Sequence, residues 1–168
     1  MDLSTSPRLY AYTGGKTFDA AKPTVVFLHG AQNDHSVWIL QSRYLAHHGY
    51  GVLALDLPGH MRSEGPALDT VEAMADRIAD ALRSAEVRQF IAVGQSMGSL
   101  IALELAKRLP ESVRGAVLVD VPAFQLVAEA TEALAGERAL LEQALREGGP
   151  GEAVRAWLAA RLRPARRQ

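Results

Sequence analysis

The chain has 168 residues, 48% of them apolar and 22% charged, with a formal net charge of −1, which fits one globular domain with a buried core and argues against a nucleic-acid partner. The absence of cysteine excludes disulfides, thiol catalysis and cysteine metal sites. Because no apolar run reaches the roughly 18 residues of a membrane helix, and the first residues lack a basic-then-apolar signal pattern, we expect a cytoplasmic protein without membrane contact.

Apolar runs alternate with helical patterns along the first 120 residues, which is typical of a parallel sheet with crossover helices. In chain order the pattern predicts a strand at 8–12, a strand at 24–28, a helix at 36–47, a strand at 51–55, a helix at 70–83, a strand at 90–93, a helix at 97–109 and a strand at 115–119. The sequence therefore predicts an α/β fold with about five strands.

The composition changes after this part of the chain. Residues 125–146 are rich in Ala, Leu and Glu, which favours helix and gives no strand signal. The run 148–151 (Gly-Gly-Pro-Gly) breaks this helix, and a last helix presents Val154, Trp157, Leu158 and Leu162 on one face before Pro164 ends it. We expect two parts, a core at 1–122 and a helical segment with a basic tail at 123–168.

The motif G-x-S-x-G occurs at 94–98, directly after the expected strand 90–93 and before the expected helix 97–109. A strand, a tight turn and a helix in this order form a nucleophile elbow, which lifts the hydroxyl of Ser96 above the edge of the sheet. Gly94 and Gly98 are needed because a Cβ there would collide with the neighbouring strand and helix. The alternative is a serine that only caps an ordinary helix.

A second motif, His29-Gly30-Ala31, ends the strand 24–28. An oxyanion hole needs one backbone N–H from the helix after the serine and another from a neighbouring loop. We therefore predict the N–H groups of Ala31 and Met97 as the two donors. His29 itself is expected to brace its loop rather than act as acid or base.

The segment 56–63 (Asp-Leu-Pro-Gly-His-Met-Arg-Ser) resembles the D-x-P-G-x-G-x-S segment of α/β-hydrolases. With the two motifs before it, the chain resembles this superfamily over roughly residues 8–120. Met61 departs from the family's usual glycine, and Gln95 stands where many relatives carry histidine. The resemblance implies a three-layer α/β fold with a mostly parallel sheet and cleavage of an ester, thioester, amide or C–C bond through an acyl-serine. Serine at the elbow disfavours dehalogenase and epoxide-hydrolase chemistry, which uses a carboxylate.

The base that would activate Ser96 is not found where the resemblance places it. The family's chain order is serine, acid, histidine, yet all five histidines here precede Ser96. The family's sheet has eight strands, and the helical stretch after Asp120 corresponds to its lid. The resemblance thus implies a hydrolase truncated within the lid.

Three residues remain as candidate acid and base. Asp120 ends the strand 115–119, where some relatives place their acid, although a solvated carboxylate at a strand end is the simpler reading. His35 and His60 follow strand ends on the same sheet edge as Ser96 and are candidates for an unconventional base, with loop bracing as the alternative. His47 and His48 lack a third ligand, so we expect no metal and no cofactor.

The leading hypothesis is a serine hydrolase for a small-molecule, ester-like substrate, and the sequence leaves open whether this chain is active. A catalytically dead binding module and a structural partner are the alternatives. In the family the strand 115–119 is interior, and the strand that would flank it is missing here. We therefore expect self-association through this sheet edge.

Overall fold

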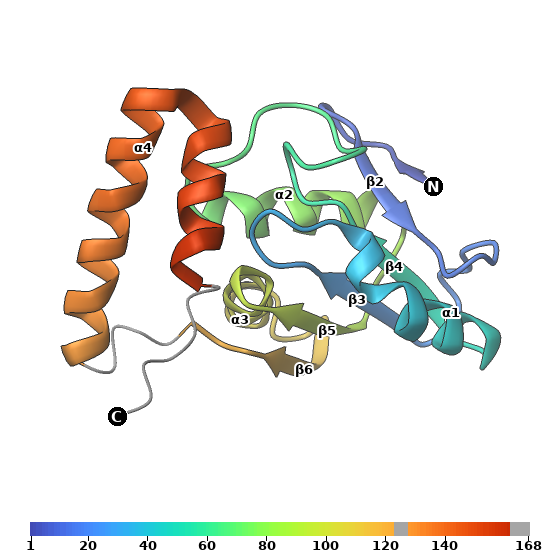
Figure 1. The fold of residues 1–168 in the computed structure, drawn as a ribbon. Coiled ribbons are helices and arrows are strands. Elements are labelled where there is room, and N and C mark those ends of the chain that lie inside the picture. The colour runs from blue at the N-terminus through green and yellow to red at the C-terminus, as the bar shows by residue number, and fades with distance from the viewer. Residues whose placement is uncertain (123–127, 162–168) are drawn as a thin grey trace. The chain divides into compact units, whose positions relative to one another are not determined.

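In the computed structural model, which describes residues 1–122 and 128–161, a six-stranded sheet lies at the centre of the first 122 residues (Figure 1). Its strands are β1 (Asp2–Leu3), β2 (Leu9–Tyr12), β3 (Thr24–Leu28), β4 (Gly51–Leu55), β5 (Phe90–Gln95) and β6 (Val113–Val119). They lie in the order β1-β2-β4-β3-β5-β6. Strands β4, β3, β5 and β6 pair in parallel with their neighbours. Strand β2 pairs antiparallel with β4, and β1 pairs antiparallel with β2. The mostly parallel α/β sheet is confirmed, with β1 as a strand that the sequence did not predict.

Helices cover both faces of the sheet, which gives three layers. The helical elements of this part are η1 (His35–Trp38), α1 (Ile39–His47), α2 (Val71–Ser84) and α3 (Met97–Arg108). One core cluster joins α2 and α3 to the sheet, and a smaller one lies on the side of α1. Strand β3 contributes to both, because Val26 and Leu28 belong to the first cluster and Val25 and Phe27 to the second. Burial on both faces explains its continuous apolar run.

The ends of the helices follow local side-chain chemistry. The carboxylate of Asp34 accepts a hydrogen bond from the N–H of Ser36, so the predicted helix 36–47 begins with the 3-10 turn η1 before α1. Helix α2 begins where the hydroxyl of Thr70 accepts the N–H of Ala73. These side chains satisfy N–H groups that the first turn of a helix leaves without partners.

The chain divides into two compact units, Met1–Pro122 and Ala123–Gln168. In the second unit, α4 (Ala128–Arg161) consists of two helical stretches that fold back on each other (Figure 1). Gly149 joins them with φ 72° and ψ −169°, a conformation that favours glycine, and Pro150 follows it. The predicted break is confirmed, whereas residues 125–127, Leu162 and Pro164 lie outside the described residues. No described helix is long and apolar enough to cross a membrane.

Candidate active site

Ser96 lies between the end of β5 and the first residue of α3, as predicted. Its φ of 51° and ψ of −118° are sparsely populated for a residue with a Cβ and cost about 1–3 kcal/mol. Two backbone hydrogen bonds hold this conformation: the N–H of Ser96 donates to Val119 O at 2.9 Å, and the N–H of Ser99 donates to Ser96 O at 2.9 Å. The side chain of Ser96 makes no capping hydrogen bond. A simple helix cap therefore does not explain this serine.

The two glycines of the motif allow β3, β5 and α3 to approach closely. A Cβ on Gly94 would collide with the backbone of Gly98 and Ser99, and a Cβ on Gly98 would collide with the backbone carbonyls of Leu28 and His29. The steric reason given for both glycines is thus confirmed. Because only hydrogen atoms fit between these segments, the elbow stands directly beside the loop that follows β3.

The loop after β3 touches the elbow at Gly30. Its N–H donates to the side-chain oxygen of Gln95 at 3.1 Å, and a Cβ on Gly30 would lie 3.2 Å from the Cβ of Ser96. The next residue, Ala31, is exposed, and its N–H has no acceptor within the described residues. Ala31 thus follows the residue that touches the elbow, and Met97 follows Ser96 as the first residue of α3. Their roles as oxyanion donors remain predictions. Sequence reasoning missed the contribution of Gln95, because the contact spans 65 residues.

His29 joins the loops that follow β3 and β4. It is fully buried, and its Nε2 accepts the N–H of Leu57 at 3.0 Å. The ring proton therefore resides on Nδ1, which faces Gly30 O at 2.8 Å. Burial lowers the pKa of His29 below its ordinary value of 6.5. The expected bracing role fits these contacts.

The burial of His29 predicts acid sensitivity. Its lowered pKa means that the unfolded chain binds the proton more readily, so the free energy of unfolding should fall as pH drops from 6.5 toward the folded-state pKa. Urea midpoints at pH 8, 6.5 and 5 measure this loss. His29→Gln should flatten the pH dependence, whereas substitution of the exposed His47 by Gln should preserve it. An equal slope in all three proteins would contradict the assignment.

His35 pairs with Asp56 at the end of β4. The carboxylate oxygen Oδ1 accepts both the backbone N–H of His35 at 2.9 Å and its Nδ1–H at 2.8 Å. The imidazole ring lies 5.3 Å from the ring of Tyr10 and 5.7 Å from that of Tyr12, both on β2. Strand β3 separates β4 from β5, so roughly 10 Å of sheet lies between the strand ends that carry Asp56 and Ser96.

His60 also has its own local partners. Its Nδ1 lies 3.0 Å from Pro58 O, and its ring packs edge-on against His29 at 5.1 Å. Within the described residues, no histidine hydrogen-bonds Ser96. The roles of His35 and His60 as base remain predictions, and the contacts of both fit loop bracing.

Asp120 lies next to the elbow in space. The backbone oxygen of Val119, the residue before Asp120, accepts the N–H of Ser96. Asp120 therefore lies at the same sheet edge as Ser96, where β5 and β6 end. Its φ of 52° departs from the strand, and it is exposed. Neighbouring strands thus place Asp120 near Ser96, while its role as catalytic acid stays a prediction.

Asp34, His35 and Asp56 bring ligand atoms within 4.8 Å of one another. These atoms already have partners: Asp56 Oδ1 binds His35, and its Oδ2 accepts the N–H of Arg62 at 3.2 Å. Asp34 caps η1. The cluster therefore braces the loops after β3 and β4, and we assign no metal to it.

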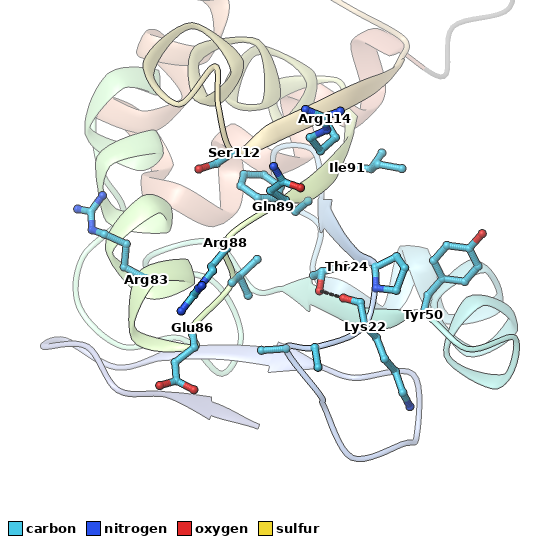
Figure 2. A pocket seen from close by; sticks show the side chains of 15 residues that line it. Lys22, Thr24, Tyr50, Arg83, Glu86, Arg88, Gln89, Ile91, Ser112 and Arg114 are labelled. Carbon is cyan, nitrogen blue, oxygen red and sulfur yellow. Dashed lines mark hydrogen bonds between the residues drawn. The ribbon is translucent and has the colours of Figure 1, made fainter.

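A groove of about 1070 Å³ lies at the other end of the strands (Figure 2). Its lining includes Thr24, Phe90 and Arg114, which stand at or near the first residues of β3, β5 and β6. Ser96 follows the last residue of β5. The groove is therefore at the edge opposite the elbow and takes no part in the site.

Comparison with known proteins agrees with this geometry. Residues 23–157 match the family model described as the alpha/beta hydrolase fold. The chain is 35% identical over 108 residues to a pimeloyl-[acyl-carrier protein] methyl ester esterase from Nitrosomonas europaea, covering 61% of this chain and 39% of the relative. It is 35% identical over 128 residues to an esterase from Mycobacterium tuberculosis, covering 71% and 40%.

Solved structures show the same fold. A thermophilic esterase from Thermogutta terrifontis superposes with a TM-score of 0.70 at 25% identity, covering 96% of this chain and 57% of that one. A bacterial membrane phospholipase A gives a TM-score of 0.62 at 34% identity, covering 68% and 36%. The chain spans about 40% of the length of the two esterases matched by sequence. From the elbow geometry and these matches together, the chain belongs to the α/β-hydrolase family.

Proposed function

We propose that this protein is a serine hydrolase that cleaves a small-molecule ester through an acyl-serine, with Ser96 as nucleophile. The observation that carries the proposal is the strained backbone of Ser96 between β5 and α3, with Gly30 packed beside it. Such a conformation persists only where the surrounding structure holds it, and it is concentrated at functional sites. The choice of an ester is supported by the relatives described as esterases.

In the proposed reaction, Ser96 Oγ bonds to the carbonyl carbon of the substrate and gives its proton to a base. The carbonyl electron pair moves to oxygen, and the N–H groups of Ala31 and Met97 stabilise that oxyanion. The alcohol leaves with a proton, and water then hydrolyses the acyl-serine by the reverse sequence. We propose Asp120 as the acid. His35 and His60 are the two candidates for the base, and the labelling experiment below decides whether either of them serves.

A catalytically dead binding module is the second candidate. It is favoured by one observation: within the described residues, no histidine hydrogen-bonds the hydroxyl of Ser96. A serine without a base is a poor nucleophile, although the proposed oxyanion donors can still bind the carbonyl oxygen of an ester. The two functions differ in the reactivity of Ser96 and not in the fold.

Labelling with a fluorophosphonate probe tests the proposal. We expect slow modification of Ser96, with a rate that rises steadily with pH because hydroxide removes the proton. Ser96→Ala should abolish the labelling, and Ser112→Ala, at the opposite sheet edge, should leave it unchanged. Equal labelling of the Ser96→Ala variant would overturn the assignment, and no labelling of the unaltered chain would favour the binding module.

Fast labelling with a plateau near neutral pH would instead identify a histidine base. His35→Gln and His60→Gln, each examined alone, would then show which ring is responsible. Loss of the plateau in one variant assigns the base to that residue, while retention in both excludes both histidines.

A further inference from the structure

Gln95 links the nucleophile elbow to the loop that follows β3. It is the last residue of β5 and directly precedes Ser96. Its side-chain oxygen Oε1 accepts the N–H of Gly30 at 3.1 Å, which is the one hydrogen bond that this side chain makes among the residues that the structure describes. A single side chain therefore connects the segment of the proposed nucleophile with the segment of Ala31, a proposed oxyanion donor.

The glycine of the His-Gly motif makes room for this contact. A Cβ on Gly30 would lie 2.6 Å from Oε1 of Gln95 and 3.2 Å from the Cβ of Ser96, and the first of these distances is too short for a real side chain. The φ of Gly30 lies outside the left-handed region, so glycine is required here for space and not for its backbone conformation. The absence of a side chain at residue 30 therefore allows Gln95 to reach the backbone of the loop.

The peptide group between Gly30 and Ala31 is held as well. Its carbonyl oxygen, Gly30 O, accepts the Nδ1–H of His29 at 2.8 Å and the N–H of Asn33 at 3.3 Å. A trans peptide group is planar, and its N–H points opposite to its C=O. The hydrogen bonds to Gly30 O therefore fix the direction of the Ala31 N–H. Gln95 holds the preceding peptide group through the N–H of Gly30.

The other hydrogen bonds of this loop lead to a different strand. Those of His29 and His35 connect the loop to the residues that follow β4. The nucleophile, however, follows β5. Among the described residues, Gln95 is the one side chain that connects the loop to the end of β5 by a hydrogen bond. The position of the loop relative to Ser96 therefore depends on this contact.

We propose that Gln95 is a positioning residue for the oxyanion hole. By holding the N–H of Gly30, it keeps the N–H of Ala31 at the place where the carbonyl oxygen of a substrate bonded to Ser96 develops its charge. The inference rests on the function proposed above, in which Ala31 and Ser96 are donor and nucleophile. Oxyanion donors lower the barrier because they are oriented before the charge develops, so the group that orients a donor contributes to the rate.

The rate of fluorophosphonate labelling measures this role. Ser96 Oγ bonds to phosphorus, fluoride leaves, hydroxide accepts the proton, and the phosphoryl oxygen takes the place of the oxyanion. At a fixed pH, Gln95→Met removes the acceptor and should lower the labelling rate roughly tenfold to a hundredfold, which is what a small misplacement of a catalytic group costs. Gln95→Asn, whose oxygen is one methylene too short for Gly30, should act alike.

Two controls accompany the labelling. Gln89→Met makes the same substitution at an exposed glutamine before β5, at the opposite sheet edge, and should keep the rate of the unaltered chain. Circular dichroism identifies a Gln95 variant that fails to fold, and the other Gln95 variant then decides. A purely structural role of Gln95 would lower the urea midpoint and leave the labelling rate of the folded protein unchanged.

Amide hydrogen exchange, measured by NMR, reports the contact itself and does not depend on reactivity. The Gly30 amide should exchange roughly threefold to tenfold faster in Gln95→Met, because it loses a hydrogen bond of ordinary strength. Gln95→Glu keeps an oxygen at the same reach and should restore slow exchange. After complete labelling, the Ala31 amide should exchange slowly in the unaltered chain, where it donates to the phosphoryl oxygen, and fast in Gln95→Met.

The two measurements separate failure of this inference from failure of the proposed function. Equal labelling rates in Gln95→Met and Gln89→Met would overturn the positioning role, and so would equally slow exchange of the Gly30 amide with and without the Gln95 oxygen. If Ser96 of the unaltered chain is not labelled at all, the proposed hydrolase is contradicted, and exchange of the Gly30 amide then decides whether Gln95 holds the loop.

Discussion

Replacing Gly98 by alanine should remove about 3 kcal/mol of folding stability, at the upper end of what an overpacked side chain usually costs. The added Cβ would meet the carbonyl oxygens of Leu28 and His29, which are backbone atoms of β3 and of the loop after it. They cannot move without disturbing the parallel pairing of β3 with its two neighbours. Urea unfolding measures the loss as a lower midpoint with an unchanged slope.

Gly115→Ala is the matched control for this experiment. Gly115 also lies in the sheet, on β6, but a Cβ there would meet no atom within 4 Å. Its replacement should leave the midpoint unchanged or raise it slightly, because alanine restricts the unfolded chain. A Gly98→Ala protein as stable as Gly115→Ala would show that β3 and α3 are not in close contact.

Much of the fold could be predicted because its strands are buried on both faces. Runs such as Thr24–Leu28 and Gly51–Leu55 are continuously apolar, and the structure forms β3 and β4 at those residues. Helix α2 was predicted from its amphipathic spacing. Strand β1 was missed, since two residues, Asp2 and Leu3, carry no periodic signal. Strand β6 begins two residues before the predicted 115, because Val113 still pairs with Phe90.

The candidate site was predictable only where it follows from short motifs. The pattern G-x-S-x-G located Ser96, and its strained φ/ψ became visible only in the structure. The contacts that hold the site together connect distant parts of the chain. Gln95 and Gly30 are 65 residues apart, and His35 and Asp56 are 21 apart. The hydrophobic periodicity of the sequence cannot predict such contacts, because they form only when the ends of different strands meet at one sheet edge.

Asp56→Ala should cost about 3 kcal/mol and also slow the labelling of Ser96. The buried carboxylate accepts the N–H and Nδ1–H of His35 and the N–H of Arg62, so it ties the loop after β3 to the loop after β4. Hydrogen bonds to a charged group are worth about 1.5–3 kcal/mol, and removal of the acceptor leaves these donors without a protein partner. Because the first of these loops carries Ala31, its release should also disturb the proposed oxyanion hole.

Two further variants show whether the hydrogen bonds of Asp56 to His35 and Arg62 are responsible for the loss of stability. Asp56→Asn keeps an oxygen for His35 but turns an NH₂ group toward the N–H of Arg62, so it should lose roughly half as much stability as Asp56→Ala. Glu64→Ala is the control. The carboxylate of Glu64 lies in the same loop as Arg62, but it is exposed and pairs with Arg8 at the surface. Exposed ion pairs contribute little, so its urea midpoint should stay close to that of the unaltered protein. If Asp56→Ala matches Glu64→Ala instead, the buried carboxylate does not hold the two loops together.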